Sequence, residues 1–554
     1  MKERIIILGA GVMQGPAIRI AREMGLFTVV LDADPQAPWV SQADRFEQID
    51  LKDKEGIEAF ARSLKSQGGL SGIMTAGTDF SASVAWVAER IGLPGIPYEA
   101  ALNASDKQRM RSCFEKAGVP SPAFTVLTGA PRNKADSVDF LPFPYPVVVK
   151  PVDNMGSRGC RRVDSPSELG VAVGEALGFS RSGRVIVESY MDGPEFSVDA
   201  IVYHGEITIC GLADRHIFFP PYFIEMGHTM PTRFPREDQR ALLDTFTQAV
   251  RSLGIAGENS SGAAKGDVKL SSQGPMIGEV AARLSGGYMS GWTYPYASGV
   301  EPIRAAIQMA VGRRPEGLSP SRSWTCAERA FISIPGRVRS IQGLEEAKAV
   351  PGVRDIFLRA EPGKEVRFPE NNVTKCGNVL AADPGREEAA GAAEKAARSI
   401  LIRLEAPNAE TRAFLEGSGP QAPGGPAAFP PDAFTLGAGL RSALEKLPDP
   451  APEGSGDLSL VPFPEFLSSG LEDYAGRGAA ESLDAVRRIT GLPLPLAGRE
   501  IGDPSGTAHG AACGLADQDT GGGGKLGRAF WKALIRGGYQ GAVYFLDDLL
   551  RRRI

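Results

Sequence analysis

The sequence has few cysteines, and they are not arranged as a metal or disulfide site. Six cysteines are scattered over 554 residues without a CxxC motif. Structural zinc sites and disulfide frameworks need closely spaced or paired cysteines, so we expect neither. The distribution fits a reducing compartment and predicts a cytoplasmic protein.

A long apolar run and a strong charge bias are also absent. No stretch approaches the roughly 18–20 apolar residues that a membrane span requires, and the chain enters a strand at Arg4 without a signal-peptide pattern. The formal net charge of -5 gives no electrostatic reason to expect nucleic acid or an acidic membrane as a partner.

The bulk composition is that of a folded globular protein. Hydrophobic residues make up 42% of the chain and charged residues 23%, which are ordinary values. A length of 554 residues exceeds one ordinary domain, and we expect about three or four units.

The N-terminal hundred residues alternate strand and helix signals. Three short apolar runs predict strands at Ile5–Leu8, Phe27–Asp32 and Gly72–Thr75, and a helix is expected over Ser83–Ile91. Strands separated by helices predict a parallel sheet covered on both faces.

Three glycines follow the first strand and open its helix. Gly9, Gly11 and Gly15 have GxGxxxG spacing rather than the GxGxxG of dinucleotide-binding turns. No residues suited to hydride transfer accompany them. We therefore favour glycines that permit a tight strand-to-helix turn, with dinucleotide binding as the alternative.

The centre of the chain mixes helices and antiparallel strands. Ser105 is expected to cap a helix over Asp106–Ala117, which Gly118 ends. Further elements are expected as strands at Val185–Glu188, Glu195–Val202, Ile207–Ile209 and Ala327–Ile334, and as helices near 236–253 and 299–312, at Gly343–Ala349 and at Ala389–Leu404.

These patterns predict a mixed α/β and α+β protein of five parts. Nine of the fifteen residues from Gly417 to Pro431 are glycine or proline, which indicates a flexible linker. Near the C-terminus, helical segments are expected at Leu483–Ile489 and Leu526–Arg553, the latter broken or kinked at Gly537 and Gly538. The predicted parts are a Rossmann-like domain (1–104), a central domain (105–320), an α+β subdomain (321–406), a Gly/Pro-rich linker (407–456) and an accessory region (457–554).

A lysine and a glycine-bearing loop form a candidate phosphate site. Lys150 ends the apolar strand Pro146–Val149, and the following loop holds Gly156, Ser157 and Gly159. Backbone N–H groups of such a loop can surround phosphate oxygens. An ordinary hairpin turn is the alternative interpretation.

Acidic pairs downstream form a candidate cation site. Asp267 and Glu279 flank an expected hairpin over Val268–Ile277, which brings flanking residues side by side so that two carboxylates share one cation. Arg283 then offers a planar fork for phosphate oxygens.

In order and spacing, these elements resemble the ATP-grasp superfamily over about residues 1–405. The resemblance is greatest to its carboxylate–amine ligase branch, which includes L-amino-acid ligases and relatives of carbamoyl-phosphate synthase and biotin carboxylase. The motifs that carry it are Gly92-Leu93-Pro94-Gly95, Asp106-Lys107, Gly118-Val119-Pro120, Lys150-Pro151, Glu188 with Glu195, Glu279-Val280-Ala281-Ala282-Arg283, Pro335-Gly336 and Pro369-Glu370-Asn371-Asn372-Val373.

The resemblance implies an ATP-grasp architecture, with subdomains that clasp ATP, and a role for several candidate residues. By this resemblance Lys107 and Lys150 contact ATP phosphates, Glu188 lies by the adenine and Glu195 by the ribose. Asp267 and Glu279 hold Mg²⁺, with Mn²⁺ as an alternative, and Arg283 steadies the transferring phosphoryl group or the acyl phosphate, so that Lys150 and Arg283 are the catalytic candidates. Further candidates come from the sequence itself: Gly156, Ser157, Gly159 and Tyr190 for the nucleotide, and Arg215, Glu225, His228, Gly286 and Gly287 for the substrate, with a structural role as the alternative for Arg215, Glu225 and His228.

Two positions depart from the family pattern. Asp267 stands where glutamate is usual, and Ala281 stands where an asparagine ligand is common. Two carboxylates with phosphate and water oxygens still complete an octahedral magnesium site. The number of metal ions is left open.

The predicted function is an ATP-dependent ligase that joins a small carboxylate to an amine through an acyl phosphate. The alternatives are a catalytically weakened ATP-binding protein whose C-terminal region binds a partner, and an ATP-driven carboxylase or carbamoyl-type enzyme. The expected partners are the two small molecules, without nucleic acid or membrane, and a homodimer is kept open.

Overall fold

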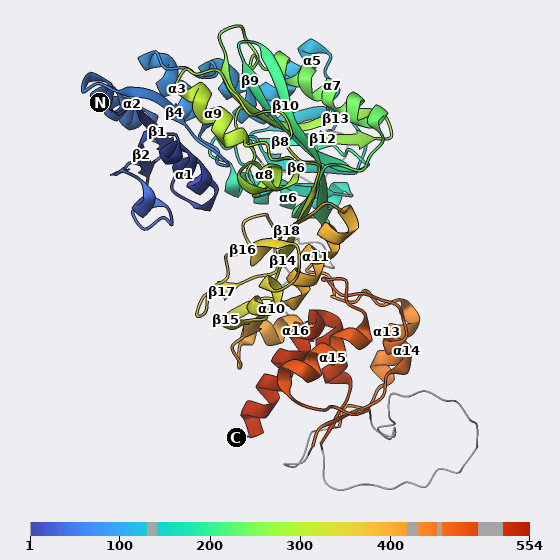
Figure 1. Ribbon diagram of the computed structural model, residues 1–554. Coiled ribbons are helices and arrows are strands. Elements are labelled where there is room, and N and C mark those ends of the chain that lie inside the picture. Colours follow the sequence, from blue (N-terminus) through green and yellow to red (C-terminus); the bar gives the residue numbers. More distant parts are fainter. Residues whose placement is uncertain (1, 130–140, 418–428, 451–456, 497–523, 554) are drawn as a thin grey trace, which may run out of the picture.

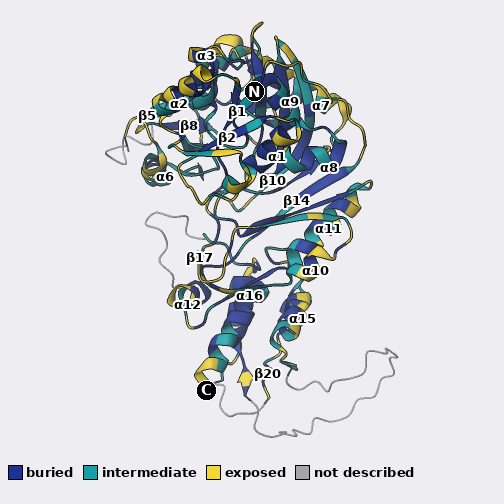
Figure 2. Ribbon diagram, turned by 60° about the vertical axis from the view of Figure 1, so that its left-hand side comes forward, coloured by how far each residue is buried: buried dark blue, intermediate teal, exposed yellow. Residues whose placement is uncertain are grey.

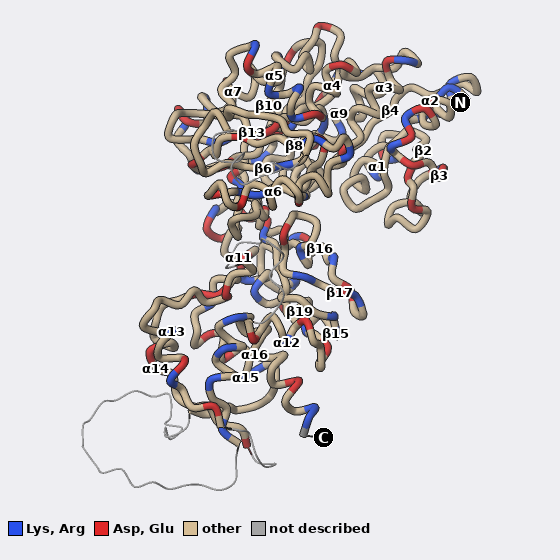
Figure 3. The backbone as a smooth tube through the Cα atoms, turned by 180° about the vertical axis from the view of Figure 1, so that it is seen from behind, with Lys and Arg blue, Asp and Glu red and all other residues tan. Residues whose placement is uncertain are grey.

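The computed structural model describes residues 2–129, 141–417, 429–450, 457–496 and 524–553 (Figure 1). The N-terminal and central regions form one end of an elongated molecule, and the C-terminal helices form the other. The strands of residues 325–404 lie between them. Acidic and basic residues are interspersed along the described part of the chain (Figure 3).

The N-terminal region is a four-stranded parallel sheet of order β3-β2-β1-β4. Alternate residues of β1 enter two different cores, since Ile5 and Ile7 pack with helix α1 whereas Ile6 and Leu8 pack with α2 and α3. The expected two-faced parallel sheet is therefore confirmed. Its elements are β1 (Arg4–Leu8), α1 (Gly15–Glu23), β2 (Phe27–Asp32), β3 (Arg45–Gln48), α2 (Lys54–Ser66), β4 (Leu70–Met74) and α3 (Ser81–Ile91), with 3₁₀ turns at Val12–Gln14 and Val40–Gln42.

A small antiparallel sheet of order β5-β8-β6-β7 follows. Val147 and Val149 of β6 face the core under helix α6, which leaves Lys150 on the opposite face. The elements are α4 (Tyr98–Ser105), α5 (Lys107–Ala117), β5 (Phe124–Leu127), β6 (Val147–Pro151), β7 (Arg161–Val163), α6 (Pro166–Phe179) and β8 (Val185–Ser189).

The largest sheet has eight strands in the order β13-β12-β9-β10-β11-β14-β18-β16. It crosses the predicted boundary at residue 320, because β11 of the central region pairs with β14 beyond it. Its elements are β9 (Glu195–Tyr203), β10 (Glu206–Phe218), β11 (Ile224–Met230), β12 (Ser261–Ser271), β13 (Gly274–Ala281), β14 (Thr325–Phe331), β16 (Val353–Leu358) and β18 (Gly377–Asp383), with α7 (Arg236–Ser252), a π-helical turn (Met289–Thr293), α8 (Tyr294–Ser298), α9 (Pro302–Ala310), α10 (Leu344–Lys348) and α11 (Arg386–Ser399).

The C-terminal elements build a helical core against a three-stranded sheet. Helix α16 is buried along most of its length (Figure 2) and bends at Gly538, as expected from the glycine pair. The elements are β15 (Gly336–Gln342), β17 (Glu365–Val366), β19 (Leu401–Leu404), α12 (Ala409–Glu416), α13 (Ala438–Lys446), β20 (Ser459–Leu460), α14 (Pro464–Leu467), α15 (Ala479–Thr490), β21 (Lys525–Leu526) and α16 (Arg528–Arg553). Within the range 407–456, α12 and α13 are thus ordered helices, and residues 418–428 lie outside the described part.

Two local predictions were wrong. Asp106, not Ser105, caps α5, because its carboxylate accepts from the N–H groups of Gln108 and Arg109. The helix expected over Ala389–Leu404 stops at Ser399, because residues 401–404 pair with β15 instead. Among the described residues, no helix is both long and apolar enough to cross a membrane.

Candidate active site

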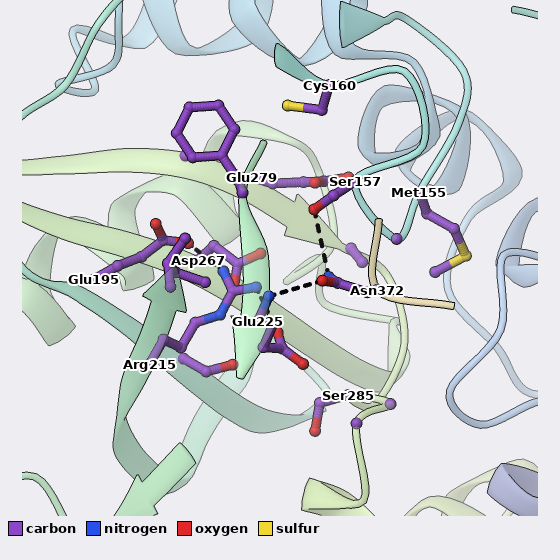
Figure 4. A pocket seen from close by; sticks show the side chains of 18 of the residues that line it. Met155, Ser157, Cys160, Glu195, Arg215, Glu225, Asp267, Glu279, Ser285 and Asn372 are labelled. Carbon is purple, nitrogen blue, oxygen red and sulfur yellow. Dashed lines mark hydrogen bonds and ion pairs between the residues drawn. The ribbon is translucent and has the colours of Figure 1, made fainter. Parts of the chain in front are cut away.

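A cavity of about 430 Å³ opens between the small antiparallel sheet and the eight-stranded sheet (Figure 4). Its size suits a small-molecule site. Strands β6 and β8 supply one wall, while β9 to β13 supply the other. All the candidate site residues except Gly159 line it, so the fold brings together residues that are up to 180 positions apart.

The cavity lining is highly charged, with more basic than acidic side chains. The basic residues are Lys107, Lys150, Arg158, Arg215, Lys265, Lys269, Arg283, Arg359 and Lys375, and the acidic residues are Glu188, Glu195, Glu225, Asp267, Glu279 and Glu328. An excess of cations within a partly enclosed space favours an anionic ligand.

Lys150 is held by a buried charge cluster. Its Nζ lies 2.7 Å from Glu188 Oε2, while Arg111 Nε lies 2.9 Å from Glu188 Oε1. Burial raises the pKa of Glu188, but Arg111 and Lys150 outweigh it and lower the pKa below its usual value. Glu188 therefore stays ionised and orients Lys150 toward the cavity.

Asp267 and Glu279 are direct neighbours across the β12–β13 hairpin, as predicted. Burial raises the pKa of Glu279, but Lys107, Lys265 and Lys150 lead the cations that hold it at about 2. Lys107 Nζ lies 3.3 Å from Glu279 Oε1. Glu279 is therefore a carboxylate at neutral pH, as metal ligation requires.

The carboxylate pair fits a hard divalent cation. Asp267 Oδ1 is buried and accepts no hydrogen bond, although it lies 2.8 Å from Arg215 Nη1 in an ion pair. Magnesium is typically held by one or two carboxylates together with phosphate oxygens and water. Among the described residues there is no cluster of three or more acidic, histidine or cysteine ligands, so substrate oxygens would have to complete the shell.

Arg283 begins the turn that follows β13. Its Nη1 donates to the carbonyl of Leu284 over 2.9 Å, and its Nε is buried without a hydrogen-bond acceptor. Next to it, Ser285 donates its backbone N–H to Asp199 over 3.0 Å. Because Asp199 is fully buried, it anchors the turn that presents Gly286 and Gly287 to the cavity.

Arg215 lies at the centre of a second charge cluster. Its guanidinium pairs with Glu195, with Glu225 at 2.6 Å and with Asp267 at 2.8 Å. Burial raises the pKa of Glu225, but His228, Arg215 and Lys375 together lower it well below its usual range. The cluster joins the predicted ribose, metal and substrate residues into one network.

His228 is fixed by a partner that sequence reasoning missed. Its Nδ1 lies 2.6 Å from Glu328 Oε2, and Asn378 Nδ2 donates to Glu328 Oε1 over 2.7 Å. The opposite ring nitrogen lies 3.5 Å from Glu225 Oε2. The histidine therefore faces the cavity in a set orientation.

The glycine-bearing loop is tied to the opposite wall by Asn372 (Figure 4). The backbone N–H of Asn372 donates to Gly156 O over 3.1 Å, and its side-chain Nδ2 donates to Ser157 Oγ over 3.4 Å. Its Oδ1 accepts from the N–H of Glu225 over 2.8 Å. Gly159 follows in the same loop with φ of +67°, and a Cβ there would come within 2.8 Å of Phe179.

Tyr190 also lines the cavity, beside cations. Its ring lies 4.5 Å from the guanidinium of Arg162 and 5.5 Å from Lys269 Nζ. Such a ring offers a flat face for a planar base.

Sequence reasoning missed several further lining residues. Glu328, Arg359 and Lys375 line the cavity from the 321–406 region, and Arg111 of helix α5 pairs with the lining residue Glu188. Only Asn372, inside the Pro369–Val373 motif, carried a signal. A side chain that completes a charge pair has no fixed spacing along the sequence from its partner, so no motif reveals it.

Comparison with known proteins identifies two domains in this chain. Residues 143–291 match the model of the ATP-grasp domain, and residues 330–405 match L-amino acid ligase C-terminal domain 2. Both domains are therefore present. The architecture is the ATP-grasp fold with an additional C-terminal region.

Three relatives illustrate the range of similarity. An uncharacterized protein, y4rH, of Sinorhizobium fredii is 26% identical over 69% of this chain and 79% of its own length. Carnosine synthase 1 of Gallus gallus is 25% identical over 57% of this chain, and the matched region covers only 36% of that protein. The crystal structure of L-amino acid ligase from Bacillus licheniformis superposes with a TM-score of 0.62 at 22% identity, covering 73% of this chain and 99% of that one.

Proposed function

We propose that this chain, which contains an ATP-grasp domain followed by an L-amino acid ligase C-terminal domain, joins a small carboxylate to an amine with ATP as phosphoryl donor. The substrate carboxylate attacks the γ-phosphorus and releases ADP, which forms an acyl phosphate. The amine then attacks the acyl carbon and releases phosphate, which leaves an amide.

The observation that carries this proposal is the Asp267–Glu279 pair, which lies among Lys107, Lys150 and Arg283 in a single cavity. Phosphoryl transfer depends mainly on positioning and on charges that stabilise the transferring group. The arrangement supplies both without a nucleophilic side chain.

The nucleotide end of the site is assigned as follows. Lys107, Lys150 and the N–H groups of Gly156, Ser157 and Gly159 bind phosphate oxygens, while Tyr190 and Glu195 border the nucleoside. Both oxygens of Glu188 are already engaged by Arg111 and Lys150. We therefore assign Glu188 to holding Lys150 in place rather than to contact with the adenine.

Asp267 and Glu279 are the residues that would hold Mg²⁺ (or Mn²⁺). When bound, the metal neutralises phosphate charge and polarises the transferring group. Glu279 stays ionised without a metal because neighbouring cations, led by Lys107, lower its pKa.

The substrate end is assigned to the turn after β13 and to the Arg215 cluster. Arg283 and the N–H groups of Gly286 and Gly287 stabilise the acyl phosphate, while Glu225 receives an ammonium group. His228 borders the same space with its orientation set by Glu328. The likeness to L-amino acid ligase supports an amino acid as the carboxylate.

The test is phosphate release from Mg-ATP by the purified full chain against pools of amino acids and other carboxylates, with and without amines. We expect release that requires both substrates and falls about 100-fold in kcat/KM in Glu279→Ala, since loss of one preorganised charge has an effect of that order. The matched control is Glu345→Ala, an exposed acid 84% accessible and outside the cavity.

Two results would contradict the proposal. One is phosphate release that is independent of any carboxylate. The other is a Glu279→Ala variant that retains the control's activity. Tight Mg-ATP binding without release from any pool would instead favour a nucleotide-binding protein without ligase chemistry.

A further inference from the structure

Five aromatic side chains connect three regions of the chain, and we call them the aromatic bridge: Phe219, Tyr222, Phe368, Phe429 and Tyr474. The ring centroids lie 5.1 Å apart for Phe219–Phe368, 5.9 Å for Phe219–Tyr474 and 5.1 Å for Phe368–Tyr474. Tyr222–Phe429 and Phe368–Phe429 lie 4.8 Å and 5.5 Å apart. Aromatic pairs at such distances stabilise each other beyond the burial of their area.

Two sides of the bridge belong to loops that line the active-site cavity. Phe219 and Tyr222 lie between β10 and β11, directly before the lining residues Phe223 and Glu225. Phe368 lies four residues before Asn372, which also lines the cavity.

Asn372 connects the loop that carries Phe368 to the glycine-bearing loop. It bonds Gly156 and Ser157 on one side and the N–H of Glu225 on the other. Because Phe368 is 4% exposed, its position restricts where the loop that carries Asn372 lies.

The third side of the bridge comes from outside the two recognised domains. The hydroxyl of Tyr474 donates to the carbonyls of Pro431 and Arg536, the second over 3.2 Å. The Arg536 carbonyl lies at the bend of α16, and the ring of Tyr474 packs on Phe219 and Phe368. Phe429 precedes α13 in the same region.

The bridge also holds a backbone conformation that would otherwise be unfavourable. Phe219 has φ of +63°, a left-handed geometry that is unfavourable for a bulky residue unless its surroundings enforce it. Its ring contacts with Phe368 and Tyr474 are the enforcing contacts.

We propose that Tyr474, with Phe429, is a positioning residue for the ligase site. It fixes Phe368 and the β10–β11 loop and thereby sets where Asn372 holds the glycine-bearing loop over the nucleotide end. The expected change in the KM for Mg-ATP rests on the proposed ligase function. The expected change in hydrogen exchange does not depend on it.

The test compares Tyr474→Ala with Tyr474→Phe in the full chain. Tyr474→Ala removes the ring and is expected to raise the KM for Mg-ATP at least tenfold, whereas Tyr474→Phe keeps the ring and stays within about twofold of wild type. Phe466→Leu is the matched control, because Phe466 is fully buried and packs on Phe434, Phe463 and Trp531 rather than on the bridge. It should lower the thermal midpoint without changing this KM.

Hydrogen–deuterium exchange provides a readout that needs no ligase activity. The amide of Asn372 donates to Gly156, and the amide of Glu225 donates to Asn372. Both amides should exchange faster in Tyr474→Ala and at the wild-type rate in Phe466→Leu.

The two readouts separate the possible failures. Equal exchange at these two amides in Tyr474→Ala and wild type would overturn the positioning role. Faster exchange in a protein that releases no phosphate with any substrate pool would support the positioning role and reject the ligase function. A KM that rises equally in Tyr474→Ala and Phe466→Leu would assign the effect to general destabilisation and also overturn the proposal.

Discussion

At the level of single residues, the cavity keeps three glutamate side chains ionised although they are fully or partly buried. Burial alone raises the pKa of a carboxyl group. For Glu188, Glu225 and Glu279 the neighbouring cations more than reverse that shift. Each carboxylate is therefore available at neutral pH, either to orient a cation or to bind one.

Glu188 provides the clearest residue-level prediction. Glu188→Gln leaves Arg111 and Lys150 buried without a counter-charge, and removal of one partner of a buried pair costs about 3–5 kcal/mol. We expect a large fall in the thermal midpoint, measured by circular dichroism, together with weaker Mg-ATP binding.

Asp244→Asn is the control for this substitution. The Arg240–Asp244 pair is 86% and 76% exposed, so its loss should change stability by less than about 1 kcal/mol. Equal midpoints for the two variants would show that Glu188 does not hold the cluster together.

At the level of elements, the junction of β11 with β14 brings the 321–406 region to the site. The junction is short, with Thr229 opposite Ala327 and Met230 opposite Cys326. Just before it, Gly227 lies so close to β14 that an added Cβ would come within 1.9 Å of the Glu328 carbonyl oxygen. Only glycine permits this approach, which also places His228 against Glu328.

Gly227→Ala is therefore expected to separate β11 from β14 and to weaken substrate binding through displaced His228. The thermal midpoint should fall, and the KM for the carboxylate should rise. Gly391→Ala is the contrasting control, because that glycine lies on the exposed side of α11 with no atom near its Cβ position. Alanine there should be neutral or stabilise by up to about 1 kcal/mol. A Gly227→Ala variant as stable as this control would contradict the close approach.

At the level of the whole molecule, the C-terminal region is part of the fold of the 321–406 subdomain. Gln540 accepts from the N–H of Ile334 over 3.1 Å and donates to the carbonyl of Ile402 over 2.7 Å. Arg403 pairs with Asp547 at 2.5 Å. Phe414, Leu415, Ala533 and Tyr544 share one apolar core with residues of that subdomain.

A chain truncated after residue 406 should consequently be unstable. It would expose the apolar surface that α12 and α16 cover and leave buried polar groups unpaired, which favours aggregation. We expect little monodisperse protein by size-exclusion chromatography and a lower thermal midpoint. The full chain with Asp547→Asn, which loses one ion pair only, should remain soluble. A monodisperse fragment with the midpoint of the full chain would contradict this prediction.

Much of the fold followed from local patterns in the sequence. The period of apolar residues predicted the parallel N-terminal sheet and most helices, and the hairpin pattern correctly predicted that Asp267 lies opposite Glu279. The helix expected over Ala389–Leu404 was wrong at its C-terminal end. Residues 401–404 form β19 instead, because β15 offers them hydrogen bonds. Local propensity does not contain that information.

The sequence by itself determined the chemistry that is available here: a lysine after a buried strand, a glycine-bearing loop, two carboxylates across a hairpin and an arginine beyond them. Only the tertiary structure decided how these groups are used. Glu188 is bound by Arg111, Arg215 is held by three carboxylates, and Asn372 joins two walls of the cavity. Motif spacing is set by one segment of backbone, whereas charge pairing and ring packing depend on segments that meet only when the chain folds.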